Sequence, residues 1–142
     1  MRTITELEKY LEENCFSFSE LTIGKHYAPE GIIIEENQGK YEFSYAERGN
    51  KTCLKSFSTE EELVHYSLQE LLGDPWSNAH IVAFTFDKEE IITAERHLQA
   101  DNIVFKRNDV PNYRAGQTAY RIFVFGKDIL RLTDFKQKYF HH

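Results

Sequence analysis

The sequence predicts an α+β domain in which one or two antiparallel β-sheets pack with three to four α-helices. Some stretches alternate apolar and polar residues with the period of two of a half-buried strand, whereas others show the 3.6-residue period and capping residues of a helix. The chain has 142 residues, of which 41% are hydrophobic, and no low-complexity linker interrupts it. We therefore expect residues 1–142 to form one domain with a packed core.

The clearest element is a β-hairpin that leads directly into a helix, between Lys40 and Pro75. From Tyr41 to Tyr45, aromatic residues alternate with polar ones, as in a strand with one buried face. Gly and Asn tolerate the positive φ of a tight turn, so we expect Gly49-Asn50 to reverse the chain and Lys51–Phe57 to form the returning strand.

The helix that follows has start and stop signals. Ser58 and Glu61 have the spacing of a capping box, and Gly73 followed by Asp74-Pro75 is typical of a helix end. The expected apolar stripe consists of Val64, Leu68, Leu71 and Leu72.

The remainder of the first half is expected to complete a meander of three or four antiparallel strands. Thr3 and Glu6 have capping-box spacing at the start of a short helix that Asn14 ends. Leu21–Tyr27 and the β-branched Gly31–Glu36 are the expected strands.

The second half is expected to share the layout of the first, strands followed by a helix, although the two halves are not similar in sequence. His80–Phe86 is almost continuously apolar, as expected of a central strand buried on both faces. The other expected elements are a helix capped by Asp87 with Glu90, a strand at Ile103–Arg107, an exposed loop at Asn108–Gln117, a strand at Thr118–Phe125 and a last helix capped by Asp128.

Charge is distributed unevenly around a net value of −6. Residues 1–74 hold 15 Asp/Glu and 7 Lys/Arg, whereas residues 75–142 hold 8 and 10. An acidic first half disfavours nucleic-acid binding there and suits a basic partner. The alternative is that these carboxylates only keep a small protein soluble.

The sequence lacks the common catalytic and metal-binding motifs. It has no CxxC, HExxH, G-x-S-x-G or glycine-rich phosphate loop, so we expect no enzyme activity, no catalytic residues, no metal and no cofactor. Glu60-Glu61-Glu62 falls at a helix start, where carboxylates meet the positive end of the helix dipole, and we prefer that interpretation to acid–base work.

Hydropathy and the N-terminal stretch indicate where the protein acts. Apolar runs are too short to cross a bilayer, and the polar N-terminal stretch does not resemble a secretion signal, so we expect a cytoplasmic protein without membrane contact. His141-His142 has the composition of an expression tag, and no functional inference is based on it.

A second functional class comes from the last third of the chain. There, basic and aromatic residues interleave as on surfaces that hold single strands by charge and stacking. The residues are Lys106, Arg107, Tyr113, Arg114, Tyr120 and Arg121. A pI near 5.5 makes nucleic acid the less favoured partner, and a solvated strand edge explains the same pattern.

The hairpin and helix resemble a segment of a known protein class. The stretch KYEFSYAERGNKTCLKSFSTEEELVHYSLQELL is similar to the strand–RG-turn–strand segment and F-x-[ST]-E-E-E helix start of immunity proteins from bacterial polymorphic or contact-dependent toxin systems. The later AYRIFVFGKDI is similar to their C-terminal strand. The resemblance implies stoichiometric inhibition of a cognate toxin C-terminal domain, commonly a nuclease with a basic groove, and it implies no active site.

This resemblance and the acidic first half together nominate a toxin-binding surface. The candidate carboxylates are Glu35, Glu36, Glu42, Glu47, Glu60, Glu61 and Glu62. Tyr41, Tyr45 and Tyr66 are candidate aromatic anchors, provided that they are exposed, because Tyr is enriched at binding hot spots.

Overall fold

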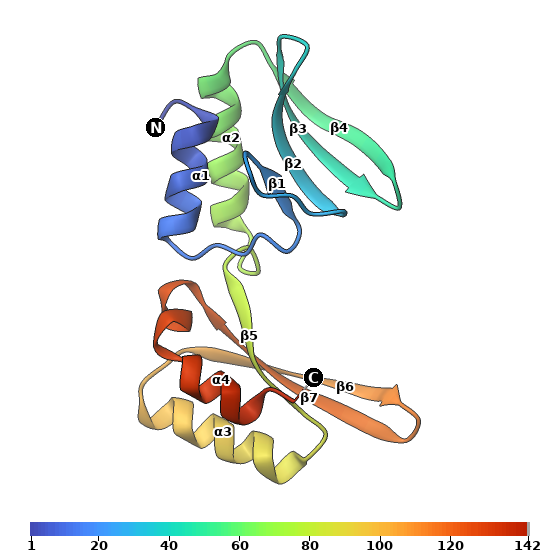
Figure 1. Ribbon diagram of the computed structural model, residues 1–142, viewed down its shortest axis with the longest axis vertical. Coiled ribbons are helices and arrows are strands. Elements are labelled where there is room, and N and C mark those ends of the chain that lie inside the picture. The colour runs from blue at the N-terminus through green and yellow to red at the C-terminus, as the bar shows by residue number, and fades with distance from the viewer. Residues whose placement is uncertain (142) are drawn as a thin grey trace. The chain divides into compact units, whose positions relative to one another are not determined.

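The α+β fold class is confirmed by the computed structural model, which describes residues 1–141, so that His142 of the terminal histidine pair lies outside the described part. The elements are α1 (Ile4–Glu13), β1 (Leu21–Ile23), β2 (Gly31–Asn37), β3 (Lys40–Glu47), β4 (Asn50–Phe57), α2 (Glu60–Gly73), β5 (Ala79–Thr85), α3 (Lys88–Ala100), β6 (Phe105–Arg114), β7 (Gln117–Phe125), the 3₁₀-helix η1 (Gly126–Arg131) and α4 (Thr133–Tyr139). Figure 1 labels the α-helices and β-strands in this way.

Contacts divide the chain into two compact units, Met1–Ser77 and Asn78–His142. Each unit has its own sheet and its own buried cluster of apolar side chains. The expectation of one domain stays a prediction. None of the helices in the described residues is long and apolar enough to span a bilayer.

The first unit contains a four-stranded sheet in the order β1-β2-β3-β4. The pairs β2–β3 and β3–β4 are antiparallel, as the meander prediction required. The prediction was wrong for β1, which is only three residues long and lies parallel to β2. Ile23 pairs with His26 immediately after β1, so the chain turns back at once and begins β2 beside the start of β1.

Helices α1 and α2 cover one face of this sheet (Figure 1). Leu7 and Leu11 of α1 are fully buried, as are Leu63 and Val64 of α2. The helix α2 begins one residue later than expected: Thr59, not Ser58, is the N-cap, and its hydroxyl accepts from the backbone N–H of Glu62. The buried face of α2 also differs from the expected stripe, because Leu63 is fully buried and Leu72 is exposed.

Both hairpin turns of the first unit use the same backbone conformation. Arg48-Gly49 joins β3 to β4 with φ values of 53° and 80°, and Gln38-Gly39 joins β2 to β3 with 52° and 80°. Two successive positive φ angles match the right-handed twist of a hairpin. The expected turn at Gly49-Asn50 was thus one residue late, because Asn50 already pairs with Glu47 as the first residue of β4.

The second unit contains a three-stranded antiparallel sheet in the order β5-β7-β6. α3 and α4 pack on one face, around buried residues such as Ile91, Leu98, Ile122 and Phe135. β7, not β5, is the central strand. β5 is nearly all apolar although it is an edge strand, because both of its faces are buried. Val82 belongs to the core under the helices, and Phe84 is covered on the other face by Phe86, Tyr113 and Phe140.

Two further expectations for the second unit were wrong. The segment Asn108–Gln117 is not a loop, because β6 extends to Arg114 and pairs with β7. Pro111, which lacks a backbone donor, falls where the register shifts between Val110 and Arg114, a position that sheets tolerate. The residues around Asp128 form the 3₁₀-helix η1, and the last helix begins only at Thr133, so Asp128 is not its cap.

Candidate functional site

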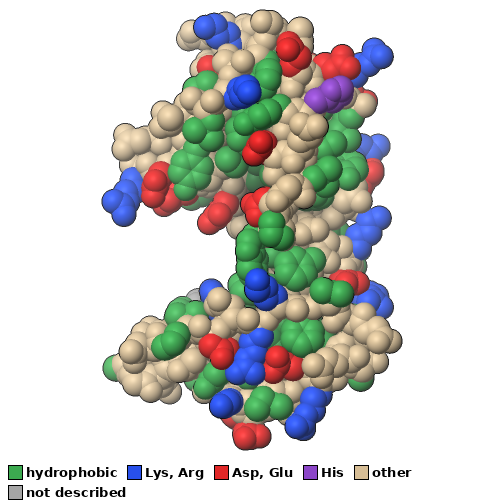
Figure 2. Space-filling model, turned by 180° about the vertical axis from the view of Figure 1, so that it is seen from behind, with side chains coloured by type: hydrophobic (Ala, Val, Ile, Leu, Met, Phe, Trp, Pro, Cys, Tyr) green, Lys and Arg blue, Asp and Glu red, His purple; other side chains and the backbone are tan. Residues whose placement is uncertain are grey.

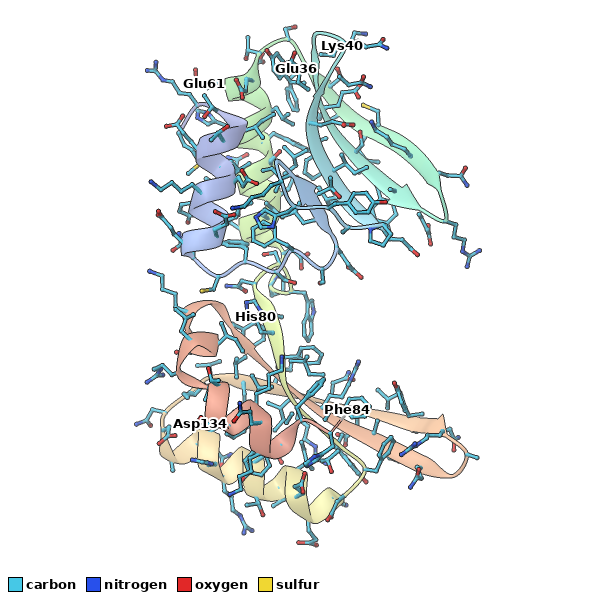
Figure 3. All side chains as sticks on the ribbon, viewed as in Figure 1. Glu36, Lys40, Glu61, His80, Phe84 and Asp134 are labelled. Carbon is cyan, nitrogen blue, oxygen red and sulfur yellow. The ribbon has the colours of Figure 1, made fainter. Side chains whose placement is uncertain are left out.

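Five glutamates gather at one end of the first unit. The β2–β3 turn and the β4–α2 connection lie at the same end of the sheet, since Tyr41 pairs with Phe57. The N-termini of both helices also lie there, because the backbone N–H of Ile4 donates to Glu60 Oε2 over 2.8 Å. We name this surface the acidic end; it comprises Glu6, Glu36, Glu60, Glu61 and Glu62. Figure 3 labels Glu36, Lys40 and Glu61 at this end.

Tyr41 lies within the acidic end, and the charge of the neighbouring carboxylates changes its pKa. The negative charge of Glu36 raises the pKa of the Tyr41 phenol, and burial and the charge of Glu60 raise it further. The phenol also hydrogen-bonds to Glu36. Both carboxylates therefore lie close to the half-buried Tyr41, although Glu36 lies near the end of β2 and Glu60 begins α2.

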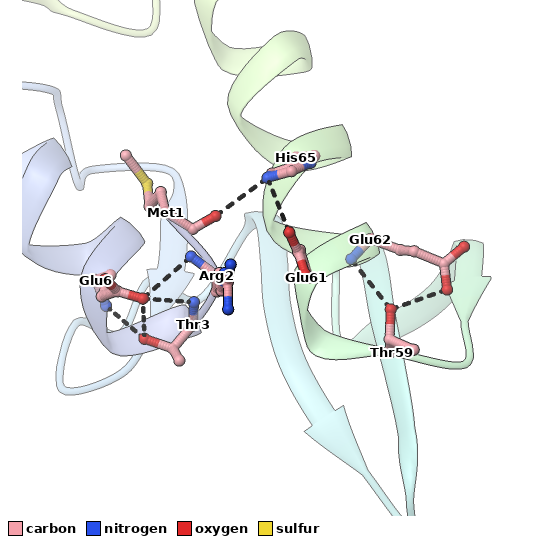
Figure 4. A network of polar contacts seen from close by, with 8 residues as sticks. All are labelled: Met1, Arg2, Thr3, Glu6, Thr59, Glu61, Glu62 and His65. Carbon is pink, nitrogen blue, oxygen red and sulfur yellow. Dashed lines mark hydrogen bonds and ion pairs between the residues drawn. The ribbon is translucent and has the colours of Figure 1, made fainter.

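Several of these carboxylates have structural roles at helix starts (Figure 4). Glu60 accepts from α1, as described above, and the Thr59 hydroxyl donates to Glu62 Oε1 over 2.9 Å. Glu6 accepts from the backbone N–H groups of Arg2 and Thr3, both at 3.0 Å. These hydrogen bonds lower the pKa of Glu6, and the bond from Arg2 has the largest effect. The sequence signalled Glu6 as a capping residue but did not associate it with the distant glutamates of α2.

Glu36 and Glu61 are the two exposed members of the acidic end with no helix-capping role. Glu61 lies 3.9 Å from His65 Nε2, which is itself 3.1 Å from the carbonyl oxygen of Met1 (Figure 4). An exposed carboxylate that caps no helix is the kind that can pair with a partner's cation without destabilising a helix start.

The structure places the other candidate glutamates elsewhere. Glu35 and Glu42 face each other across β2 and β3 on the sheet face opposite the helices. There Lys51 forms an ion pair with Glu35, and that hydrogen bond raises the pKa of Lys51. Asn37 Nδ2 donates to Glu42 Oε1 over 3.2 Å. Glu47 precedes the β3–β4 turn, at the opposite end of the sheet. The seven candidate glutamates thus occupy three separate places.

The two remaining tyrosines differ in role. Tyr66 is half-buried and packs against Phe43 and Phe57, with ring centroids 5.1 and 5.3 Å away, and Lys55 Nζ lies 5.2 Å from its ring centre. It therefore belongs to the edge of the core. Tyr45 is 39% exposed and is available as an anchor.

One group of side chains in the first unit has the composition of a metal site. The ligand atoms of Glu8, Glu12 and His26 lie within 4.8 Å of one another. The sequence did not predict this group, because His26 is distant along the chain and matches no ligand motif. The carboxylates already have partners: Glu8 Oε2 accepts from the backbone of Lys25 at 2.8 Å, and Glu12 Oε2 lies 2.6 Å from His26 Nε2. The group links α1 to the turn after β1.

Alternation along β6 and β7 separates the six basic and aromatic candidates of the second unit. Arg107 and Tyr120 face the helices, and Arg107 bonds to Asp109 at 2.9 Å and to Glu95 of α3 at 2.8 Å, contacts that raise its pKa. Lys106 and Arg121 fall on the other face, which we name the helix-free face. In Figure 2, which shows the molecule from behind, the Lys/Arg side chains of this unit lie among hydrophobic and acidic ones.

Arginines stack on aromatic rings near and on the helix-free face. The Arg114 guanidinium carbon lies 4.0 Å from the centre of the Phe86 ring, and that of Arg121 lies 5.3 Å from the Phe123 ring. Asn108 Oδ1 accepts from Arg121 Nη2 at 2.6 Å and holds this guanidinium in place.

Comparisons of the chain with protein-family models, with characterised proteins and with solved structures found no match.

Proposed function

We propose that the chain is an immunity protein, which binds a basic toxin domain stoichiometrically and neutralises it through the acidic end of its first unit. The observation that supports this most is that the charge boundary coincides with the structural boundary. Met1–Ser77 holds 15 Asp/Glu and 7 Lys/Arg, whereas the second unit holds 8 and 10. A separate acidic unit suits a basic partner surface, such as a nuclease groove that normally binds phosphates.

Charge complementarity affects both the binding free energy and the rate of association. Close charge pairs in a nuclease–inhibitor complex contribute roughly 1.5–7 kcal/mol each, and complementary potentials accelerate the encounter at low salt. Glu36 and Glu61 are the members of the acidic end that we expect to form such pairs, since they are exposed and cap no helix. The other three glutamates would add to the potential while stabilising the helix starts.

The resemblance of the hairpin and α2 to immunity proteins supports a toxin, rather than another basic protein, as the partner. In this proposal the chain is not an enzyme and needs no cofactor, because inhibition consists of covering the toxin's groove. It acts in the cytoplasm, where a nuclease toxin would meet its substrate.

The test is charge reversal with a matched control. Glu36→Lys combined with Glu61→Lys removes two such pairs and should weaken binding to the purified toxin domain at least about 100-fold at physiological salt, and the variant's affinity should depend less on salt. Glu13→Lys combined with Glu30→Lys changes the net charge equally at exposed positions of the same unit, outside the acidic end. Equal affinity of the two double variants would contradict the proposed surface.

A second function, single-stranded nucleic-acid binding, is favoured by one observation. Arg114 and Arg121 stack on rings in and beside a sheet face that no helix of the second unit covers, and such surfaces hold phosphates and bases. Arg114→Ala with Arg121→Ala should abolish anisotropy changes of a labelled oligothymidine, while Arg96→Ala with Arg131→Ala should not. Absence of binding by the wild-type protein at physiological salt would exclude this function.

A further inference from the structure

The first unit contains a hollow of about 290 Å³ at the C-terminal end of α2. Its apolar floor is formed by Leu21, Ile32 and Leu71, from β1, β2 and α2. Ligand pockets for drug-sized molecules are usually ~300–1,000 Å³. A hollow at the lower limit of that range is large enough for one inserted side chain.

Two aromatic side chains line this hollow and remain accessible. Trp76 is 44% exposed and Tyr45 is 39% exposed. The backbone N–H of Trp76 donates to Asp74 Oδ1 over 2.9 Å, which fixes the start of the indole relative to the end of α2. Exposed aromatic residues beside an apolar floor are typical of sites that accept an anchor from a partner.

The charge of the hollow is negative. Glu20 and Asp74 line it, and among the described residues around it none is a lysine, arginine or histidine. The last turn of α2 carries no basic side chain, so the partial negative charge at this helix end is not offset from within the helix. A cation is the complementary occupant.

We propose that this hollow binds an arginine side chain of the partner protein. An arginine has an apolar stem for the floor, a planar guanidinium that stacks on aromatic faces, and donors for carboxylates. A lysine offers a charge without the planar group, and a neutral side chain does not balance the negative charge of the two carboxylates. The identity of the partner as a toxin rests on the proposed function, whereas the preference of the hollow for arginine does not.

Trp76 makes the proposal directly measurable, because it is the only tryptophan in the 142 residues. The probe is N-acetylarginine amide added to the full chain, with intrinsic tryptophan fluorescence as the readout. We expect a saturable change in the millimolar range. The citrulline analogue, which keeps the shape and lacks the charge, should bind at least tenfold more weakly. No saturable change, equal binding of citrulline, or tighter binding of N-acetyllysine amide would overturn the proposal.

Variants then locate the site. Asp74→Asn retains an oxygen that can accept from Trp76, and with Glu20→Gln it should weaken arginine binding at least fivefold, whereas Glu30→Gln, outside the hollow, should leave it unchanged. Equal weakening by Glu30→Gln would contradict a local site. Because the probe is not the toxin, loss of arginine binding removes only this proposal, and failure to bind any toxin removes only the proposed function.

Discussion

Replacing one buried leucine in each unit tests whether the two cores are energetically separate. Leu11 of α1 lies in the first buried cluster and Leu98 of α3 in the second, and both are fully buried. Leu→Ala in such positions costs roughly 2–5 kcal/mol through lost burial and a residual cavity. Since 1.4 kcal/mol corresponds to a factor of ten, a loss of about 3 kcal/mol would lower amide protection about 150-fold.

The assay is native-state hydrogen exchange, followed amide by amide. If each core stabilises only its own unit, Leu11→Ala lowers protection in β2 and β3 (Gly31–Glu47) and leaves β7 unchanged, and Leu98→Ala does the reverse. A uniform loss of protection in both units from either variant would refute the reasoning. That outcome would instead support the single cooperative domain that the sequence predicts.

Two further predictions concern the first unit alone. Gly31 has a φ of +111°, and a Cβ added there would overlap the backbone carbonyl of Glu20. Gly31→Ala should therefore lower the free energy of urea unfolding by at least about 2 kcal/mol, whereas Gly39→Ala, whose surroundings are open, should lower it by about 1 kcal/mol. Equal losses would contradict the close approach of Glu20 to Gly31. The hydrogen bond to His26 lowers the pKa of Glu12 below its ordinary 4.5, so the stabilisation from the ionised carboxylate is present above that pH and lost as pH falls through the lowered value. Wild type should therefore exceed Glu12→Gln in stability at pH 6, and that difference should shrink between about pH 5 and 3; a difference that grows in acid would contradict this assignment.

Local patterns predicted elements well where capping and turn chemistry decided them. Thr3 with Glu6, and Asp87 with the backbone of Glu90, cap helices as their spacing indicated. The start of α2 was missed by one residue because Ser58 and Thr59 are both good caps, and only the structure shows which hydroxyl reaches a free N–H.

Tertiary context decided the remainder. Pro111 and Gly116 indicated a loop, yet pairing with β7 extends β6 past the proline by means of a register shift. The parallel pairing of β1 depends on the turn at His26, a contact with no sequence signature.

The candidate site was predictable in composition and not in arrangement. Alternation alone places Glu35 and Glu36 on opposite faces of β2, but the association of Glu36 with Glu60 requires knowing that the β2–β3 turn and the start of α2 share one end. The arginine-binding hollow combines residues from four separate stretches, including Glu20, Tyr45 and Trp76, so periodicity could not reveal it.

The most direct test of the central proposal is co-expression of this chain with the product of the gene immediately upstream. The account predicts a toxic partner whose killing is suppressed by this chain, one-to-one co-purification of the two proteins, and weakening of both effects when Glu36 and Glu61 are replaced by lysine. A non-toxic upstream product, or a complex that forms equally well with the lysine variant, would contradict it.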